Sequence, residues 1–331
     1  MKSYYTKFIF LAVAMGLVLV SRMMYPSVFS ADSVSEVGAI ASATTAAVST
    51  SLSANAGIGS GASAPVFGSS SLASLTPNGV LTLFSHTGDA LPPKLQDEAS
   101  LVADIDTGTV FERVNDATRW PMASLTKLMT ATLVFDDIDL NATITITPQM
   151  FAADPEERTL VVGGTYSVND LLHALLLPSS NVAAEAFADY YGRARFMDMM
   201  NARAVAWGMT NTYFDDPSGI SSANQSTPDD LLKLAQKVYQ NYPQIFAITR
   251  TPEVMITELN SGKKVLVQSI NDFAGAPDFV GGKTGHTIEA DGNLLSVFNY
   301  DGHPFIVIVF GSNDRFGDTK ALYNWFKANY S

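Results

Sequence analysis

The chain has 331 residues, of which 47% are hydrophobic, so it can bury a sizeable core and is not globally disordered. Its formal net charge of −12 disfavours nucleic acid and anionic membrane surfaces as partners, because both repel an acidic chain. The absence of cysteine excludes disulfides, thiolate nucleophiles and cysteine metal ligands.

The first 30 residues have the pattern of an export signal. Lys2 and Lys7 precede an apolar run over 8–20, which ends before Arg22. A run of this length fits a signal-peptide core and is short for a spanning helix, which needs roughly 20 residues. We expect cleavage before Ala31, with an uncleaved N-terminal anchor as the alternative. In both cases the remainder would be exported, to the periplasm, the cell wall or the medium, and the only membrane contact would be N-terminal.

Residues 31–90 are rich in Ser, Ala, Thr and Gly. Such side chains bury too little apolar surface to offset the entropy of ordering, so this segment is predicted to be a flexible linker. Composition changes near Leu91, and residues 91–331 are predicted to form the folded domain.

Within that domain the hydrophobic pattern predicts strands at both ends and helices between them. Strands are expected at 101–106, 109–113, 142–147 and 159–162, and three adjacent antiparallel strands at 279–283, 293–300 and 304–311. Helices are expected at 122–135, 168–176, 180–190, 195–207, 228–239 and 320–330. This order predicts an α+β fold, in which an antiparallel sheet from both ends packs with helices and a helical lobe. The cleft between sheet and lobe is the expected position of a site.

Ser124 and Lys127 lie three residues apart at the start of the helix predicted after Pro121. This spacing places them on one helix face, where lysine can activate the serine hydroxyl if it is neutral. The helix dipole and burial both disfavour the ammonium there. Taken alone, Ser-x-x-Lys is more often a helix cap beside a solvated lysine.

Ser179 and Asn181 belong to a Ser-x-Asn sequence between two predicted helices. Ser179 can relay a proton, and the Asn181 amide can bind both a lysine and a substrate carbonyl. The alternative is a helix N-cap made by Ser179 or Ser180.

Lys283, Thr284 and Gly285 follow about 100 residues later, at the end of a predicted strand. A lysine and a hydroxyl at a strand end suit a substrate carboxylate, and glycine lets a substrate backbone lie close.

Together, in this order and spacing, Ser-x-x-Lys, Ser-x-Asn and Lys-Thr-Gly resemble the motifs of penicillin-binding proteins and serine β-lactamases. From about residue 101 onward the chain is similar to the low-molecular-mass D-alanyl-D-alanine carboxypeptidase family. The segments 207–214, 217–219 and 226–231 also resemble that family. The resemblance implies a β-lactamase/penicillin-binding-protein-like transpeptidase fold.

The resemblance also implies roles for individual residues. Ser124 would be acylated by the penultimate D-alanine, with Lys127 as base and Ser179 in the proton relay. Asn181, Lys283, Thr284 and Gly285 would bind the substrate. The backbone amides of Ser124 and His286 would form the oxyanion hole. Peptidoglycan stem peptides would be the substrate and β-lactams covalent inhibitors, with no cofactor or metal.

Two departures leave the cleaved bond open. Many carboxypeptidases have Ser-Gly-Asn-Asp in the second motif, where this chain has Ser180 and Val182. The resemblance implies a carboxypeptidase that removes the terminal D-alanine, with endopeptidase cleavage of peptidoglycan cross-links as the alternative. Arg315 resembles an arginine near the family site, with a surface salt bridge as its alternative.

A β-lactamase and a non-catalytic module are weaker interpretations, and the remaining acidic and histidine residues indicate no further site. A class A β-lactamase needs Glu-x-x-Leu-Asn between the second and third motifs, whereas Glu258-Leu259-Asn260 has the wrong spacing and is predicted to be an exposed loop or hairpin. The acidic residues Asp154, Glu156 and Glu157 are expected to form a solvated face. A non-catalytic peptidoglycan-binding module would not need the complete set of motif residues. The four histidines show no metal-ligand spacing.

Overall fold

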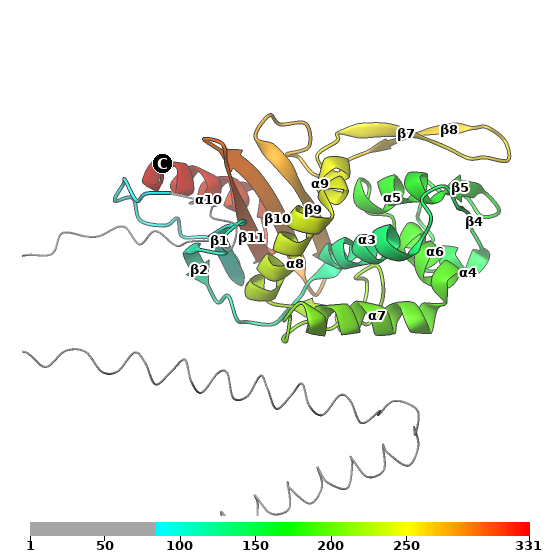
Figure 1. The fold of residues 1–331 in the computed structure, drawn as a ribbon, viewed down its shortest axis with the longest axis horizontal. Coiled ribbons are helices and arrows are strands. Elements are labelled where there is room, and N and C mark those ends of the chain that lie inside the picture. The colour runs from blue at the N-terminus through cyan, green and yellow to red at the C-terminus, as the bar shows by residue number, and fades with distance from the viewer. Residues whose placement is uncertain (1–83) are drawn as a thin grey trace, which may run out of the picture. The chain divides into compact units, whose positions relative to one another are not determined.

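The computed structural model describes residues 84–331, whose centre is a five-stranded antiparallel sheet (Figure 1). The strands are β1 (Ala99–Asp104), β2 (Val110–Val114), β9 (Phe279–Thr287), β10 (Asp291–Tyr300) and β11 (His303–Ser312). Their order is β2-β1-β11-β10-β9, so strands from the two ends of the domain pair directly. This confirms the predicted α+β fold with a sheet built from both ends.

Both faces of the sheet are covered. All six residues of β1 are buried, with Leu101 and Ala103 in one hydrophobic cluster and Val102 in the other. Alternate residues of a strand point to opposite faces, so β1 is apolar on both. On the Val102 side the sheet packs against Trp325 and Phe326 of α10 (Arg315–Asn329).

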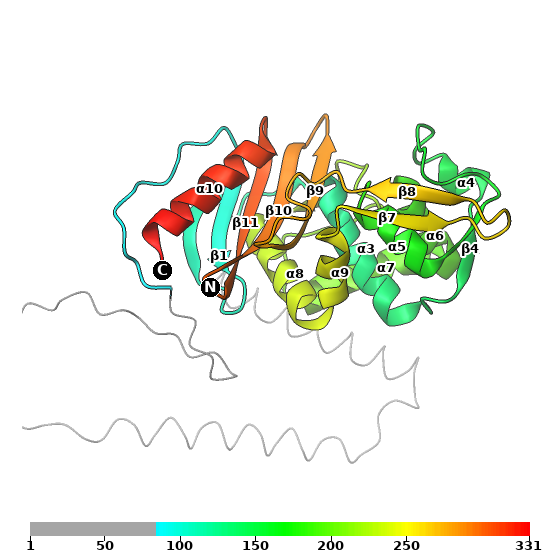
Figure 2. The same cartoon turned by 90° about the horizontal axis from the view of Figure 1, so that it is seen from above.

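The other face packs against the helical part of the chain (Figure 2). Its helices are the 3₁₀-helix η2 (Ala123–Leu125), α3 (Thr126–Asp137), α4 (Pro148–Phe151), α5 (Val168–Leu176), α6 (Asn181–Tyr191), α7 (Arg193–Ala206), α8 (Pro228–Asn241) and α9 (Pro243–Thr249). Three two-stranded sheets join β3 (Trp120–Pro121) to β6 (Gln225–Ser226), β4 (Thr143–Thr145) to β5 (Thr165–Ser167), and β7 (Glu253–Thr257) to β8 (Lys264–Gln268).

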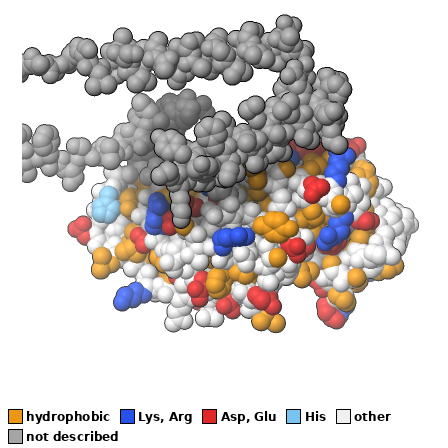
Figure 3. All heavy atoms as spheres, turned by 90° about the horizontal axis from the view of Figure 1, so that it is seen from below, with side chains coloured by type: hydrophobic (Ala, Val, Ile, Leu, Met, Phe, Trp, Pro, Cys, Tyr) orange, Lys and Arg blue, Asp and Glu red, His pale blue; other side chains and the backbone are white. Residues whose placement is uncertain are grey.

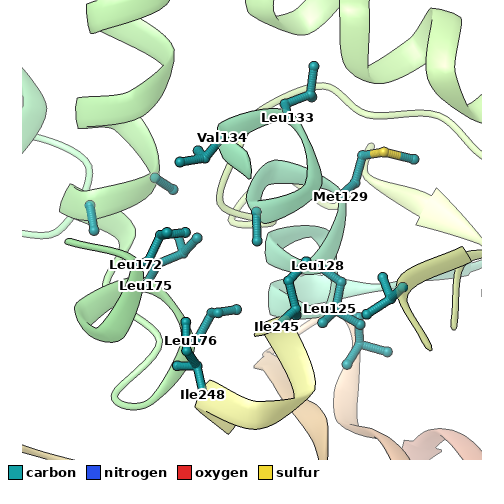
Figure 4. Packing of buried hydrophobic residues seen from close by; sticks show 14 of the residues in the cluster. Leu125, Leu128, Met129, Leu133, Val134, Leu172, Leu175, Leu176, Ile245 and Ile248 are labelled. Carbon is teal, nitrogen blue, oxygen red and sulfur yellow. The ribbon is translucent and has the colours of Figure 1, made fainter. Parts of the chain in front are cut away.

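Helix α3 passes through the core of this part. Every residue from Thr126 to Val134 is buried, so the helix is enclosed on all sides rather than amphipathic. Figure 4 shows Leu128 and Val134 of α3 among leucines of α5 and isoleucines of α9. A helix held in this way fixes the position of any side chain in its first turn.

Several predicted elements differ from the structure. Residues 159–162 are not a strand, because β4 pairs instead with Thr165–Ser167 after the turn at Gly163 and Gly164. Val161 and Val162 are therefore about half exposed, at 49% and 50%. Helix α9 was not predicted, and neither were strands β7 and β8, although a loop or hairpin was expected at 258–260. Strand β9 continues beyond Lys283, so the Lys-Thr-Gly sequence lies inside a strand and not at its end.

Residues 84–90 already belong to the folded body, although their composition assigned them to the linker. Phe84 packs on Phe111 and Phe326, with ring centroids 5.6 and 4.9 Å apart. The backbone amide of Thr87 donates to the Asn329 carbonyl at 2.7 Å. The body therefore begins before the predicted boundary at residue 91. The predicted signal segment and most of the predicted linker lie outside the described residues.

Within residues 84–331, no helix combines the length and apolar character that crossing a membrane requires. On the face drawn in Figure 3, basic and acidic side chains are interspersed with apolar ones.

Candidate active site

Ser124 lies on η2, a tight turn held at the entrance to α3. The preceding residue, Ala123, has φ +48°, a left-handed conformation that is uncommon for a residue with a Cβ. Gly219 packs on this turn with φ +87°, and a Cβ there would overlap the Ala123 carbonyl. The turn is therefore supported by a glycine that is distant in the sequence.

Lys127 is completely buried and makes three hydrogen bonds. Its Nζ donates to Ser124 Oγ at 2.8 Å, to Asn181 Oδ1 at 2.7 Å and to the Ser218 carbonyl at 2.6 Å. Three acceptors match the three protons of an ammonium. The first motif thus meets the second motif and the Ser218 loop, which includes the segment 217–219 that also resembles the family.

Burial lowers the pKa of Lys127 from 10.5 to about 7. The negative charges of Asp216, Asp154 and Glu157 oppose this shift. A lysine with this pKa is neutral in a large fraction of molecules near neutral pH. A neutral amine has two N–H groups and one lone pair. If Asn181 and Ser218 take the two N–H groups, the lone pair faces Ser124 Oγ.

Asp216 organises the Ser218 loop, and sequence reasoning missed it. Its Oδ1 accepts from the backbone amides of Ser218 and Gly219 and from the Ser218 hydroxyl, at 2.6–2.8 Å. Its Oδ2 accepts from the Ser221 amide and from Asn224 Nδ2, both at 2.7 Å. Burial would raise the pKa of Asp216, but these hydrogen bonds hold it below its ordinary value. A signal was available, because an aspartate just before Pro-Ser-Gly is typical of a side chain that binds turn amides.

The adjacent serines of the second motif have different partners. Ser180 is the N-cap of α6, and its Oγ accepts from the Ala183 amide at 3.1 Å. Ser179 has φ +67° and accepts from Lys283 Nζ at 2.9 Å. The capping interpretation therefore applies to Ser180, whereas Ser179 faces the third motif.

Lys283 is buried and also donates to the Thr284 carbonyl at 2.9 Å. Burial holds its pKa well below the ordinary value, and the nearby charges of Lys127 and Arg315 lower it further. Binding a carboxylate there would supply the missing negative charge. Thr284 is buried on the same strand.

Gly285 brings β9 against the Ser124 turn. A Cβ at this position would lie 2.9 Å from the Met122 carbonyl oxygen and 3.2 Å from the Ser124 amide nitrogen. The His286 side chain is exposed, with Nδ1 3.0 Å from the Asp291 carbonyl oxygen, so only its backbone belongs near the site. This arrangement places the two proposed oxyanion-hole residues on neighbouring backbones.

Arg315 contacts the same strand. Its Nη1 donates to the Gly285 carbonyl at 2.9 Å. Burial lowers the pKa of Arg315, and the negative charge of Asp272 opposes that shift. A hollow of about 370 Å³ beside it is lined by His286, Gly292 and Phe316, among others.

Two acidic residues differ from their sequence-based interpretation. Asp154 is only partly exposed, and its Oδ2 accepts from Asn181 Nδ2 at 3.1 Å, so it reaches the site. Glu258 lies in the β7–β8 turn as expected but is buried, because it accepts from the Thr165 and Ser261 amides. Glu156 is exposed and pairs with Arg158 at 2.9 Å.

The two departures from the family's second motif lie away from the reacting groups. Ser180 caps α6, and Val182 is completely buried in the hydrophobic core. Neither residue contacts Lys127 or Lys283 among the hydrogen bonds of the described chain.

The serine–lysine cluster, defined as the five motif residues that meet here, can support covalent catalysis. The cluster comprises Ser124, Lys127, Ser179, Asn181 and Lys283. It holds a serine hydroxyl beside a buried lysine with lowered pKa, together with a second buried lysine. Within residues 84–331 no group of His, Cys, Asp or Glu side chains could hold a metal ion.

A family model and several known proteins are similar to this chain, and their descriptions agree with one another. The family model described as D-alanyl-D-alanine carboxypeptidase matches residues 87–314. A D-alanyl-D-alanine endopeptidase of Escherichia coli is 31% identical over 250 residues, which cover 72% of this chain and 79% of that protein. A D-alanyl-D-alanine carboxypeptidase of Mycobacterium tuberculosis is 28% identical over 235 residues, covering 68% and 80%.

A solved structure has the same fold. The crystal structure of a Streptomyces DD-transpeptidase superposes with a TM-score of 0.66 at 29% identity, covering 72% of this chain and all of that one. The motifs, the fold and these relatives agree, and the chain belongs to the D-alanyl-D-alanine carboxypeptidase family of serine peptidases.

Proposed function

We propose that the protein is a serine-type D-alanyl-D-alanine carboxypeptidase, which removes the terminal D-alanine from peptidoglycan stem peptides. The observation that carries this proposal is the position of Lys127, buried and hydrogen-bonded to Ser124 Oγ at 2.8 Å. Its pKa of about 7 supports the role of general base.

In the proposed reaction Ser124 Oγ attacks the carbonyl carbon of the penultimate D-alanine while neutral Lys127 takes the hydroxyl proton. The amides of Ser124 and His286 stabilise the negative charge on the carbonyl oxygen. The C–N bond then breaks, the proton passes through Ser179 to the leaving amine, and D-alanine departs. Water hydrolyses the ester on Ser124.

Lys283 and Thr284 are proposed to bind the carboxylate of the terminal D-alanine. Lys283 lies beside Ser179, so the carboxylate would be held next to the proton relay. The lowered pKa of Lys283 means that carboxylate binding would draw a proton onto it. Gly285 would allow the substrate backbone to lie along β9.

Penicillin labelling tests this proposal. A fluorescent penicillin should label the wild-type protein covalently, whereas Ser124→Ala should stay unlabelled with an unchanged circular dichroism spectrum. A folded wild-type protein that remains unlabelled would rule the proposal out. Fast release of hydrolysed penicillin would indicate a β-lactamase instead.

Cleavage of peptide cross-links is the second candidate activity, because the Escherichia coli relative at 31% identity is named an endopeptidase. Purified pentapeptide and cross-linked muropeptides, compared at equal concentration, separate the two activities by their products. We further propose that the protein acts outside the cytoplasm, as its N-terminal sequence suggests.

A further inference from the structure

The site contains a carboxylate that the motifs do not include. Asp154 lies just after α4, and its two oxygens have separate partners. Oδ1 accepts from the Glu156 backbone amide at 3.2 Å, and Oδ2 accepts from Asn181 Nδ2 at 3.1 Å. The first contact holds the carboxylate within its own loop, and the second directs it at the serine–lysine cluster.

Asn181 is the link between Asp154 and Lys127. Its Oδ1 accepts from Lys127 Nζ at 2.7 Å while its Nδ2 faces Asp154. The two ends of an amide have nearly the same shape, so contacts alone select its orientation. Reversing this amide would set Nδ2 against an ammonium and Oδ1 against a carboxylate, and both contacts would be unfavourable.

The orientation of the Asn181 amide depends most on Asp154 when Lys127 is neutral. A neutral amine can accept as well as donate, so Lys127 then no longer distinguishes the two ends of the Asn181 amide. Asp154 still does. With Oδ1 kept toward Lys127, one N–H of the amine is occupied there, and the Ser218 carbonyl at 2.6 Å takes the other. The remaining lone pair is directed at Ser124 Oγ.

We infer that Asp154 is a positioning residue, which holds the Asn181 amide so that neutral Lys127 presents its lone pair to Ser124. The inference rests on the proposed function of Lys127 as base. Asp216 has the corresponding role for the Ser218 carbonyl, since it binds the amides of Ser218 and Gly219. Each of the two acceptors that orient the amine is thus held by its own carboxylate.

The charges around Lys127 determine the sign of the expected pH effect. Asp216, Asp154 and Glu157 favour its ammonium, whereas Lys283 opposes it when it carries a proton. Removing the Asp154 charge therefore favours the neutral amine and lowers the pH at which acylation is half-maximal. A variant that merely loosened the loop and admitted water would raise that pH instead, because burial is what lowers the pKa of Lys127.

The test is the rate of acylation by a fluorescent penicillin between pH 5 and 9. For Asp154→Ala we expect the plateau rate to fall about tenfold, because the base is misdirected. The half-maximal pH should also fall, by roughly half a unit. Asp154→Asn should show the lower half-maximal pH with a smaller loss of rate, since its oxygen can still accept from Asn181. Asp154→Glu, which keeps the charge, should restore the wild-type half-maximal pH.

Glu156→Gln is the matched control, because Glu156 lies in the same loop but is exposed and paired with Arg158. It should match the wild type in both quantities. An Asp154→Ala protein with the wild-type plateau and half-maximal pH would overturn the inference, and so would an upward shift.

A second measurement separates this inference from the proposed function. The pKa of Lys127, followed by NMR in protein labelled at lysine Cε, should be lower in Asp154→Asn than in the wild type. This readout needs no acylation. If the wild type is not labelled by penicillin, the proposed function fails, whereas an unchanged lysine pKa in Asp154→Asn contradicts the contact network itself.

Discussion

At the scale of single residues, side chains that are adjacent in the sequence have different roles in the site. Ser180 caps α6, and Ser179 contacts Lys283 at 2.9 Å. The three motifs could be predicted from the sequence because their residue types, order and spacing together resemble those of a known family. Asp154 could not be found in this way, since it acts through Asn181, a residue that the fold brings near. Asp216 binds amides of its own loop, and the aspartate just before Pro-Ser-Gly was a local signal that the motifs do not include.

The adjacent serines make a direct prediction. Ser179→Ala should lower the acylation rate by about 10²–10⁴-fold, the range for loss of a proton-transfer group, with little change in stability. Ser180→Ala should leave acylation close to the wild-type rate and lower the free energy of unfolding by about 1 kcal/mol, because the cap of α6 is lost. Urea unfolding and penicillin labelling of both variants check this. The reverse pattern would show that the two serines have exchanged roles.

The lowered pKa of Lys127 leads to a prediction for the pH dependence of acylation. Its pKa lies near 7, and only the neutral amine can accept the Ser124 proton. The second-order rate constant should therefore rise about tenfold per pH unit below 7 and level off above it. Lys127→Met should lose about 10²–10⁴-fold at pH 8, whereas Lys264→Met, an exposed lysine on β8, should not. A rate that stays constant from pH 5 to 9 would contradict the assignment of Lys127 as base.

At the scale of elements, some features of the fold leave a signal in the sequence and others do not. The strand register that brings β9 beside η2 is set by tertiary packing, which no local pattern reports. The β7–β8 hairpin was predictable in principle, because Asn260-Ser261-Gly262 lies between two runs rich in β-branched residues. Helix α9 has only seven residues and follows α8 directly, so its boundary gives little periodic signal.

Replacing Gly219 should strongly disturb the Ser124 turn. Gly219→Ala would combine a left-handed φ with overlap of the Ala123 carbonyl, so we expect loss of penicillin labelling and a large fall in stability. Gly262→Ala is the control, because φ is +68° there but nothing lies within 4 Å of the added Cβ. It should cost only about 1–2 kcal/mol and leave labelling intact. Equal effects from the two variants would show that the contact with Ala123 is unimportant.

The lowered pKa of Glu258 leads to a prediction for how stability depends on pH. Its pKa is lowered to about 2 by the Ser261 hydroxyl and then by the amides of Thr165, Asn260 and Ser261. A carboxyl with a lowered pKa in the folded state stabilises it above the ordinary value of 4.5, and this contribution is lost as pH falls toward 2. The free energy of unfolding should therefore fall more steeply between pH 5 and 3 in the wild type than in Glu258→Gln. Glu253→Gln, exposed on the same hairpin, should retain the wild-type slope, and identical slopes in all three would refute the prediction.

At the scale of the whole molecule, the sheet joins the two ends of the domain and places the third motif opposite the first two. The α+β class and the pairing of terminal strands could be predicted, since strand patterns lie at both ends of the domain and helices between them. The start of the domain could not, because Phe84 and Thr87 join it through contacts with the C-terminal helix. The composition of a segment reports only its average apolar content, so it does not reveal a few contacts of this kind.

The central claim is that Ser124 forms the acyl-enzyme, and peptide mapping tests it most directly. After incubation with benzylpenicillin and digestion, mass spectrometry should find the penicilloyl adduct on the peptide that contains Ser124 and Lys127. The Ser124→Ala protein should carry no adduct anywhere. An adduct on a different serine, or a folded wild-type protein without any adduct, would contradict the account.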